Sequence, residues 1–83
     1  MLTWTSCAWE DYLYWQTTGK QMLKRINRLI QEIQRQPFTG IGDPEPLKHH
    51  LAGCWSRRID LQHRLVYQVQ DGALIILQCR YHY

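Results

Sequence analysis

Residues 73–83, with the sequence ALIILQCRYHY, carry the strongest strand signal in this chain of 83 residues. The run is rich in the β-branched, aliphatic and aromatic side chains that are typical of strands. Side chains on a strand point alternately to its two faces. The apolar face is predicted to carry Ile75, Leu77, Cys79 and Tyr81. The opposite face then presents Gln78, Arg80 and His82, unless this end of the strand is frayed and solvated.

The last strand is predicted to cover residues 73–81. Two further strands are predicted before it, at residues 55–59 and 63–69, and the connections between the three are short. Short connections join antiparallel neighbours, so the three strands form a meander. Alternation turns Arg57 toward the core, which is unusual for a charged residue, and we therefore expect it near an edge of the sheet. The core-facing residues of the middle strand are expected to be Leu65, Tyr67 and Val69.

Two helices are predicted ahead of the meander, after a short first strand at residues 2–4. The first helix covers about residues 7–16, is capped by Thr5 or Ser6 and stops at Gly19. Its core-facing side is expected to carry Ala8, Trp9, Tyr12, Leu13 and Gln16. The second helix ends at Gln36-Pro37. Its apolar residues fall at helical spacing, at Met22, Leu23, Ile26, Leu29, Ile30 and Ile33.

The predicted order of elements is therefore β-α-α-β-β-β. This order indicates an α+β fold in which two N-terminal helices pack on one face of a small, twisted, mainly antiparallel sheet. A chain of this length is expected to form a single domain, residues 1–83, with a thin core. Four tryptophans and five tyrosines supply much of the surface that such a core can bury.

The composition limits the classes of function. A net charge of +3 is a mild bias toward anionic partners. The three cysteines, Cys7, Cys54 and Cys79, lack the spacing of a zinc site or a disulfide framework. The sequence shows neither a secretory signal nor an apolar run of about 18 residues, so a cytoplasmic protein without a membrane partner is expected.

A polar face is predicted on the side of the sheet that is turned away from the helices. Its members are Arg58, Arg64, Gln68, Gln78, Arg80 and His82. Glu45 lies between Pro44 and Pro46, and the restricted φ of proline holds its loop stiff. If that loop folds over the polar face, Glu45 supplies a base, while Lys48 and His49 add a cation and proton-transfer capacity. An ordinary surface loop and a face of solvated arginines are the alternatives.

Such a set of residues suits a phosphodiester. Arginine stays charged, and its planar fork matches phosphate oxygens. Histidine can donate a proton to a leaving alkoxide near neutral pH. The chain has no cluster of acidic residues for a two-metal nuclease. A metal-free reaction that uses the 2′-hydroxyl of RNA as the nucleophile fits the residues better and selects RNA over DNA.

Five separated blocks of the sequence resemble the YoeB toxins of the RelE superfamily, in order and over essentially the whole chain. These blocks are Glu10–Trp15, Pro44–His49, Trp55–Ile59, His63–Tyr67 and Arg80–Tyr83. The resemblance implies a RelE-like microbial ribonuclease fold, no metal or other cofactor, and a toxin that cuts messenger RNA in the ribosomal A site. It also implies a YefM-type antitoxin as partner, a homodimer, and binding to operator DNA only as the complex with antitoxin.

The resemblance further implies roles for individual residues. Glu45 matches the general base, His82 the general acid and Arg64 the cation that stabilises the phosphate. Tyr83 matches an active-site aromatic residue near the leaving group. Supporting cations are implied at Lys48 and Arg58.

Two alternatives remain open from the sequence. A gyrase-directed toxin of the ParE type, or a non-catalytic binding module, would share the architecture without needing Glu45, Arg64 and His82 together. The basic residues Lys24, Arg25 and Arg28 of the second helix are either an ordinary solvated face or a surface that tracks ribosomal RNA phosphates.

Overall fold

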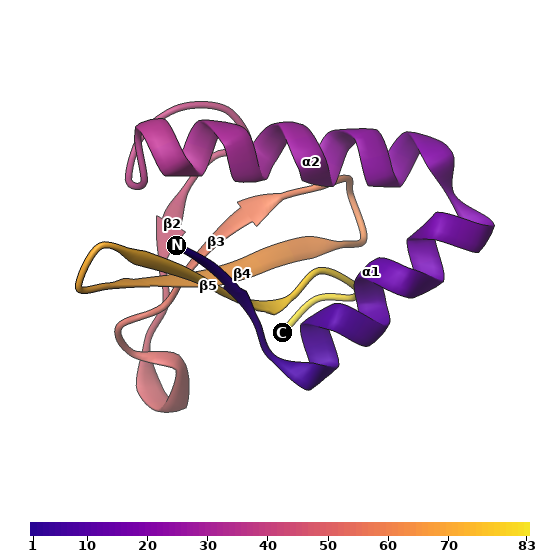
Figure 1. The fold of residues 1–83 in the computed structure, drawn as a ribbon. Helices are drawn as coiled ribbons and strands as arrows, with labels where there is room; N and C mark the ends of the chain where they lie inside the picture. The colour runs from indigo at the N-terminus through magenta and orange to yellow at the C-terminus, as the bar shows by residue number, and fades with distance from the viewer.

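The computed structural model describes residues 1–83 and has five strands and two long helices (Figure 1). The elements are β1 Leu2–Trp4, α1 Ser6–Thr18, α2 Lys20–Arg35, β2 Glu45–Pro46, the 3₁₀ turn η1 His49–Leu51, β3 Trp55–Arg58, β4 Arg64–Gln70 and β5 Ala73–Gln78. The strands form one sheet in the order β1-β5-β4-β3-β2. β1 is parallel to β5, and the other neighbours are antiparallel. The predicted α+β architecture is confirmed, and β2 and η1 are additions to it.

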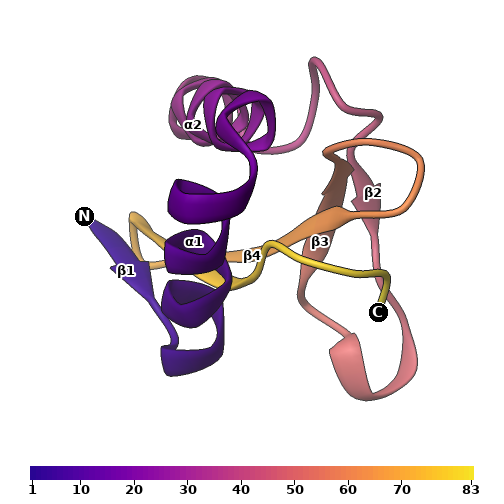
Figure 2. The ribbon, with the colours of Figure 1, turned by 90° about the vertical axis from the view of Figure 1, so that its right-hand side faces the viewer.

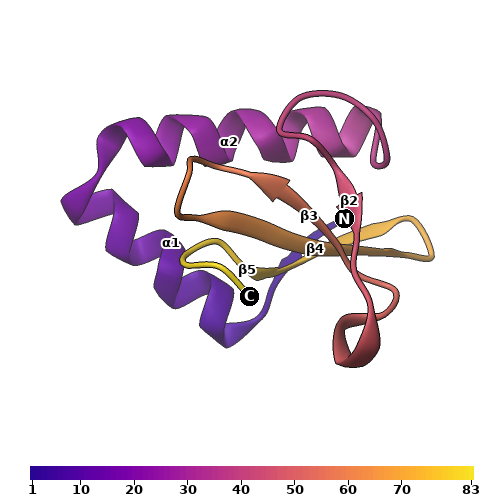
Figure 3. The same ribbon diagram turned by 180° about the vertical axis from the view of Figure 1, so that it is seen from behind.

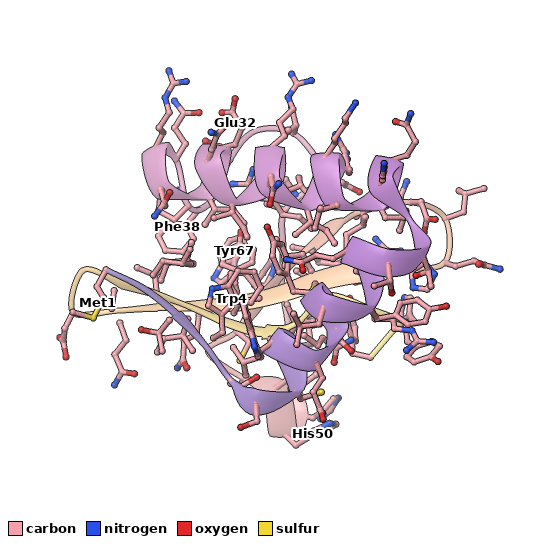
Figure 4. All side chains as sticks on the ribbon, turned by 45° about the vertical axis from the view of Figure 1, so that its right-hand side comes forward. Met1, Trp4, Glu32, Phe38, His50 and Tyr67 are labelled. Atoms are coloured by element: carbon pink, nitrogen blue, oxygen red, sulfur yellow. The ribbon has the colours of Figure 1, made fainter.

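Both helices contribute to one core on one face of the sheet. Figure 2 looks nearly along α2 and shows α1 descending from it across the sheet. Ile26, Leu29, Ile30 and Ile33 of α2 are buried, which confirms the predicted apolar stripe. From the sheet, Leu65, Tyr67, Leu74 and Ile76 complete this core. Tyr67 lies between α2 and the sheet (Figure 4).

The prediction for the core side of α1 was partly wrong. Thr5 caps the helix as expected, because its Oγ1 accepts a hydrogen bond from the backbone N–H of Ala8. Trp9 and Leu13 are both more than 40% exposed, however, and Trp15 is buried instead. The Trp15 indole N–H donates to the carbonyl of Cys79, so a tertiary contact at the far end of β5 decides which side of α1 faces inward.

The predicted faces of the last strand were wrong for most of its length. Leu74 and Ile76 face the core, not Ile75 and Leu77. Tyr67 of β4 pairs with Ile76, whereas the preceding residue pairs with Gln78, so β5 contains one extra residue. Such a bulge reverses the alternation, since side chains alternate with a period of two. Cys79 therefore faces the core as predicted, but only because the extra residue restores the predicted alternation beyond the bulge.

The last strand is also shorter than predicted, since β5 ends at Gln78 and not at Tyr81. Residues 79–83, here called the C-terminal segment, run from beside α1 toward β2 and β3 (Figure 2). The thiol of Cys79 is fully buried, and burial raises its pKa to about 12. This cysteine is therefore a packing residue, which agrees with the absence of any role predicted for it.

Arg57 turns toward the core, as predicted, and lies on β3 next to the two-residue edge strand β2. Its side chain is nevertheless completely buried. The guanidinium donates to the carbonyls of Gln36, Thr39 and Ile41 and to the hydroxyl of Tyr67. A buried cation is tolerated when its N–H groups are satisfied in this way. Arg57 thus ties the segment that follows α2 to the centre of the molecule.

Replacing this arginine should destabilise the fold. In Arg57→Met the three carbonyls and the Tyr67 hydroxyl lose their donors, and we expect unfolding free energy to fall by at least about 3 kcal/mol. Urea denaturation followed by far-UV circular dichroism measures this. Arg28→Met, on the exposed side of α2, is the matched control and should change stability by less than about 0.5 kcal/mol. An Arg57→Met protein as stable as that control would show that these hydrogen bonds contribute nothing net.

Candidate functional site

Glu45 reaches the sheet because it belongs to a strand and not to a loop. β2 pairs with β3 so that Glu45 lies opposite Ser56. Residues opposite each other in a ladder project from the same face of the sheet. Glu45 therefore shares a face with Ser56 and, two residues farther along β3, with Arg58. Arg57, which lies between Ser56 and Arg58, faces the core, so Ser56 and Arg58 lie on the face turned away from the helices. Figure 3 shows β2 and β3 from behind.

Tyr83 joins this group from the other end of the chain. Its hydroxyl donates to Oε1 of Glu45 at 2.9 Å and lies 3.3 Å from Oγ of the buried Ser56. The C-terminus accordingly ends near β2 and β3 in Figure 2. The pair of Glu45 and Tyr83, 38 residues apart in sequence, is brought together by the fold. Ser56 was not predicted as part of the site, because a serine in a strand gives no sequence signal of its own.

Two arginines stand next to each other on the same face. Arg58 and Arg64 are paired across β3 and β4. Arg58 lies 3.7 Å from the carboxylate of Asp43, and the Arg58 side chain is about half exposed. The Nε of Arg64 is buried and makes no hydrogen bond. A buried guanidinium donor without a partner is rare in proteins, and an anionic ligand such as a phosphate would satisfy it.

His82 and Arg80 have different surroundings. His82 is exposed, and its ring packs against that of Tyr83 with centroids 4.5 Å apart. Arg80, predicted beside His82 on the polar face, instead lies against α1. Its guanidinium carbon is 3.5 Å from the centroid of the Tyr14 ring and 4.5 Å from that of Tyr81. That expectation was wrong because the alternation of β5 does not continue beyond Gln78.

A cavity of about 690 Å³ opens beside Glu45. It is lined by residues 45–51 and Tyr83, and therefore includes Lys48 and His49 among the predicted residues. His49 has a positive φ of 59°, which starts the turn η1. His50, labelled in Figure 4, lies at the end of the molecule remote from α2 and was not predicted. The cavity lies next to the Glu45–Tyr83 pair.

The helix residues predicted to contact ribosomal RNA lie far from this cavity. Lys24 and Arg28 are exposed on α2, whose outer side carries many charged and polar side chains (Figure 4). Arg25 is less exposed and donates to the carbonyl of Arg58 at 3.3 Å. Arg25 therefore supports β3, and the other two form the outward basic surface.

Backbone groups of the C-terminal segment make four hydrogen bonds to α1 and to residues 63–64. The N–H of Cys79 donates to Asp11, and its carbonyl accepts from Trp15. The N–H of Tyr81 donates to Nδ1 of His63 at 2.7 Å, and its carbonyl accepts from the N–H of Arg64 at 3.0 Å. These contacts, which the sequence did not predict, hold His82 and Tyr83 where they are.

Burial raises the pKa of the Asp11 carboxyl above its ordinary value, although the N–H of Cys79 and the charge of Arg80 oppose this shift. Asp11 is the acceptor that fixes the first residue of the C-terminal segment. No group of three or more histidine, cysteine, aspartate or glutamate side chains is arranged to hold a metal ion. None of the helices combines the length and the apolar character needed to cross a membrane.

Comparisons with known proteins agree on one family. The model of the YoeB-like toxin of bacterial type II toxin–antitoxin systems matches residues 4–83. The chain belongs to this family. Toxin YoeB of Escherichia coli K12 is 58% identical over 82 residues, which cover 99% of this chain and 98% of the relative. The resemblance to YoeB toxins seen in the sequence is therefore confirmed.

Solved structures of YoeB toxins share the fold. A YoeB/ParE toxin from Agrobacterium tumefaciens has a TM-score of 0.96 at 51% identity, covering 99% of this chain and 98% of that one. YoeB in a YoeB–YefM complex from Staphylococcus aureus has a TM-score of 0.93 at 48% identity, with 100% and 97% covered. YafQ from E. coli, at 15% identity and a TM-score of 0.83, shares the fold alone; the match covers 99% of this chain and 92% of YafQ.

The raised pKa of Asp11 predicts how stability depends on pH. Because the folded protein holds this proton more tightly than the unfolded chain, the contribution of Asp11 to stability is fully present below the ordinary pKa of 3.8 and is lost as pH rises through the folded-state pKa. Asp11→Asn keeps an acceptor for Cys79 and carries no charge. Its melting temperature relative to the native sequence should therefore rise from acidic to neutral pH.

Thermal unfolding at a series of pH values measures this difference. Asp71→Asn, on the exposed turn between β4 and β5, is the matched control for the loss of a surface carboxylate. A melting temperature of Asp11→Asn that falls relative to that of the native chain from acidic to neutral pH would contradict the assigned sign.

Proposed function

We propose that residues 1–83 form a single-domain endoribonuclease toxin that cuts messenger RNA in the ribosomal A site. The observation that carries this proposal is the hydrogen bond from Tyr83 to Glu45. It brings the C-terminal segment against a carboxylate on the sheet face that also bears Arg58 and Arg64. A base, two cations and an imidazole form the minimum set for cleaving RNA by its own 2′-hydroxyl.

In the proposed reaction Glu45 takes the proton of the 2′-hydroxyl, and the 2′-oxygen attacks the adjacent phosphorus. Arg64 and Arg58 compensate the additional negative charge on the phosphorane. His82 donates a proton to the departing 5′-oxygen as the P–O bond breaks. The products are a 2′,3′-cyclic phosphate and a free 5′-hydroxyl, so atoms and protons balance without a metal. Tyr83 holds one oxygen of Glu45 and leaves Oε2 to accept the proton.

The cavity beside Glu45 supports the binding part of the proposal. Its volume of about 690 Å³ can hold a nucleotide next to the scissile phosphate. Lys48 at its wall would contact a backbone phosphate, and His49 lies on the same wall. Arg80 would not contact the scissile phosphate directly, because the rings of Tyr14 and Tyr81 enclose its guanidinium.

We further propose that a YefM-type antitoxin neutralises the toxin, that the toxin forms a homodimer, and that operator DNA is bound only by the complex with antitoxin. Solved structures of a YoeB–YefM complex and of a YoeB dimer from S. aureus, both 48% identical to this chain, support the first two statements. A gyrase-directed function is the second candidate, because the A. tumefaciens relative is described as a YoeB/ParE toxin.

Removing the proposed acid tests the nuclease function. His82→Gln should cut ribosome-bound message about 10²–10⁴-fold more slowly, because a positioned general acid contributes that much. Toeprinting of a translated message gives the rate and the position of the cut. The melting temperature should stay unchanged, since His82 is exposed.

A 2′-deoxy substitution at the scissile nucleotide is the substrate control and should abolish the cut made by the native protein. Full cleavage by His82→Gln would exclude His82 as the acid. Relaxed or broken DNA with translation still running would favour the gyrase-directed function.

A separate prediction concerns the basic surface of α2. If Lys24 and Arg28 contact ribosomal phosphates, replacing both by glutamine should weaken ribosome binding and reduce the salt slope by about one unit for each lost contact. Binding to vacant ribosomes at several salt concentrations measures the slope. Lys20→Gln, on the same exposed side, tests whether the effect is local. An unchanged slope in the double variant would make this surface an ordinary solvated one.

A further inference from the structure

The C-terminal segment leaves the sheet after Gln78 and then lacks the hydrogen bonds of a strand ladder. Tyr81, His82 and Tyr83 are all exposed. Tyr81 also has a positive φ of 65°, a conformation that costs a residue other than glycine on the order of 1–2 kcal/mol. Some interaction must therefore hold this segment in place against both solvent and backbone strain.

His63 provides that interaction. Its Nδ1 accepts the N–H of Tyr81 at 2.7 Å, and the next residue, Arg64, donates its N–H to the carbonyl of Tyr81 at 3.0 Å. Both backbone groups of Tyr81 are thus bonded to consecutive residues at the start of β4. The imidazole itself is fixed, because its ring meets the buried Trp15 edge-on, with centroids 4.9 Å apart.

The chemistry of this contact requires one form of the imidazole. A nitrogen that accepts a hydrogen bond carries no proton, so His63 must be neutral with its proton on Nε2. An imidazolium carries a proton on both nitrogens, so its Nδ1–H would face the backbone N–H of Tyr81 and no hydrogen bond could form. The residue is half-buried and is turned toward the backbone rather than toward the cavity beside Glu45. It can therefore act on a reaction only through the segment it holds.

We propose that His63 is a positioning residue: its neutral imidazole fixes the backbone at Tyr81 and so places His82 and Tyr83 against Glu45 and Arg64. The two residues after Tyr81 are the proposed acid and the phenol bonded to Glu45. The residue after His63 is the proposed phosphate cation. The hydrogen bond from the Tyr81 N–H to His63 thus joins the C-terminal segment to the start of β4, and these two segments carry His82, Tyr83 and Arg64. The effect on catalysis rests on the proposed nuclease function; the contact at Tyr81 does not.

Four variants separate positioning from general stability. His63→Leu removes the acceptor at similar volume, and His63→Gln moves an amide oxygen toward the place of Nε2. His63→Asn keeps an oxygen close to the place of Nδ1. Leu61→Ala changes an 89% exposed residue of the same turn and is the matched control.

The measurements are amide hydrogen exchange at Tyr81 by NMR, cleavage kinetics on programmed ribosomes, and thermal unfolding. In His63→Leu and His63→Gln, Tyr81 should exchange about tenfold faster or more, because its hydrogen bond is lost. In both, kcat should fall at least about tenfold with KM for the ribosome within about twofold, as for a group needed only in the transition state. His63→Asn should recover both properties, and Leu61→Ala should match the native protein.

The other outcomes either contradict the positioning role of His63 or show that the nuclease function, and not the positioning role, is wrong. Native exchange at Tyr81 in a folded His63→Gln or His63→Leu protein overturns the positioning role. So does a His63→Asn protein that keeps slow exchange at Tyr81 yet cleaves as poorly as His63→Gln. If His63→Leu does not fold, the comparison of the asparagine and glutamine variants decides. If the native protein does not cleave message at all, the nuclease function fails, and exchange at Tyr81 together with the Tyr83 ring resonances still tests the positioning.

Discussion

The buried guanidinium of Arg57 is the constraint on which the rest of the molecule depends. It has no carboxylate partner, so backbone carbonyls from the segment after α2 must satisfy it. Those carbonyls fix the course of the chain from Gln36 to Ile41, and the backbone N–H of Arg58 then binds Gly42. The chain is thereby delivered to β2 in the register that puts Glu45 opposite Ser56. A cation in the core thus sets the position of a carboxylate on the opposite face.

The second half of the candidate site is built by a different device. A bulge in β5 and the end of that strand at Gln78 release the C-terminal segment from the sheet. Side chains from α1 and the start of β4 then capture its backbone at Cys79 and Tyr81. The site is thus assembled from segments that are remote in sequence. The C-terminal segment contacts the side chains of Glu45 on β2 and Ser56 on β3 through the Tyr83 hydroxyl.

Regular periodicity explains what could be predicted from the sequence. The stripe of α2, the meander and the shared face of Arg58 and Arg64 all follow from repeating patterns. The run ALIILQ is apolar at both parities, so its bulge could not be predicted. The end of the strand at Gln78 could not be predicted either, and Arg80 lies beyond it, where the alternation no longer applies. The partners of Arg57 and His63 are backbone groups, which every residue carries, and no sequence pattern marks them. The position of Glu45 between two prolines indicates a stiff segment, but its pairing with Ser56 depends on the contacts of Arg57, which the sequence does not reveal.

The edge of the sheet at β2 has a consequence for how this protein can meet others. Open sheet edges invite strand addition by foreign chains, and short or proline-containing edges prevent it. β2 has only two residues, and Pro44 and Pro46 on either side of Glu45 have no amide proton to donate. A strand from another chain could therefore form very few backbone hydrogen bonds along this edge. The carboxylate of Glu45 therefore stays exposed, and the three-residue edge of β1 is the other place where a strand could be added.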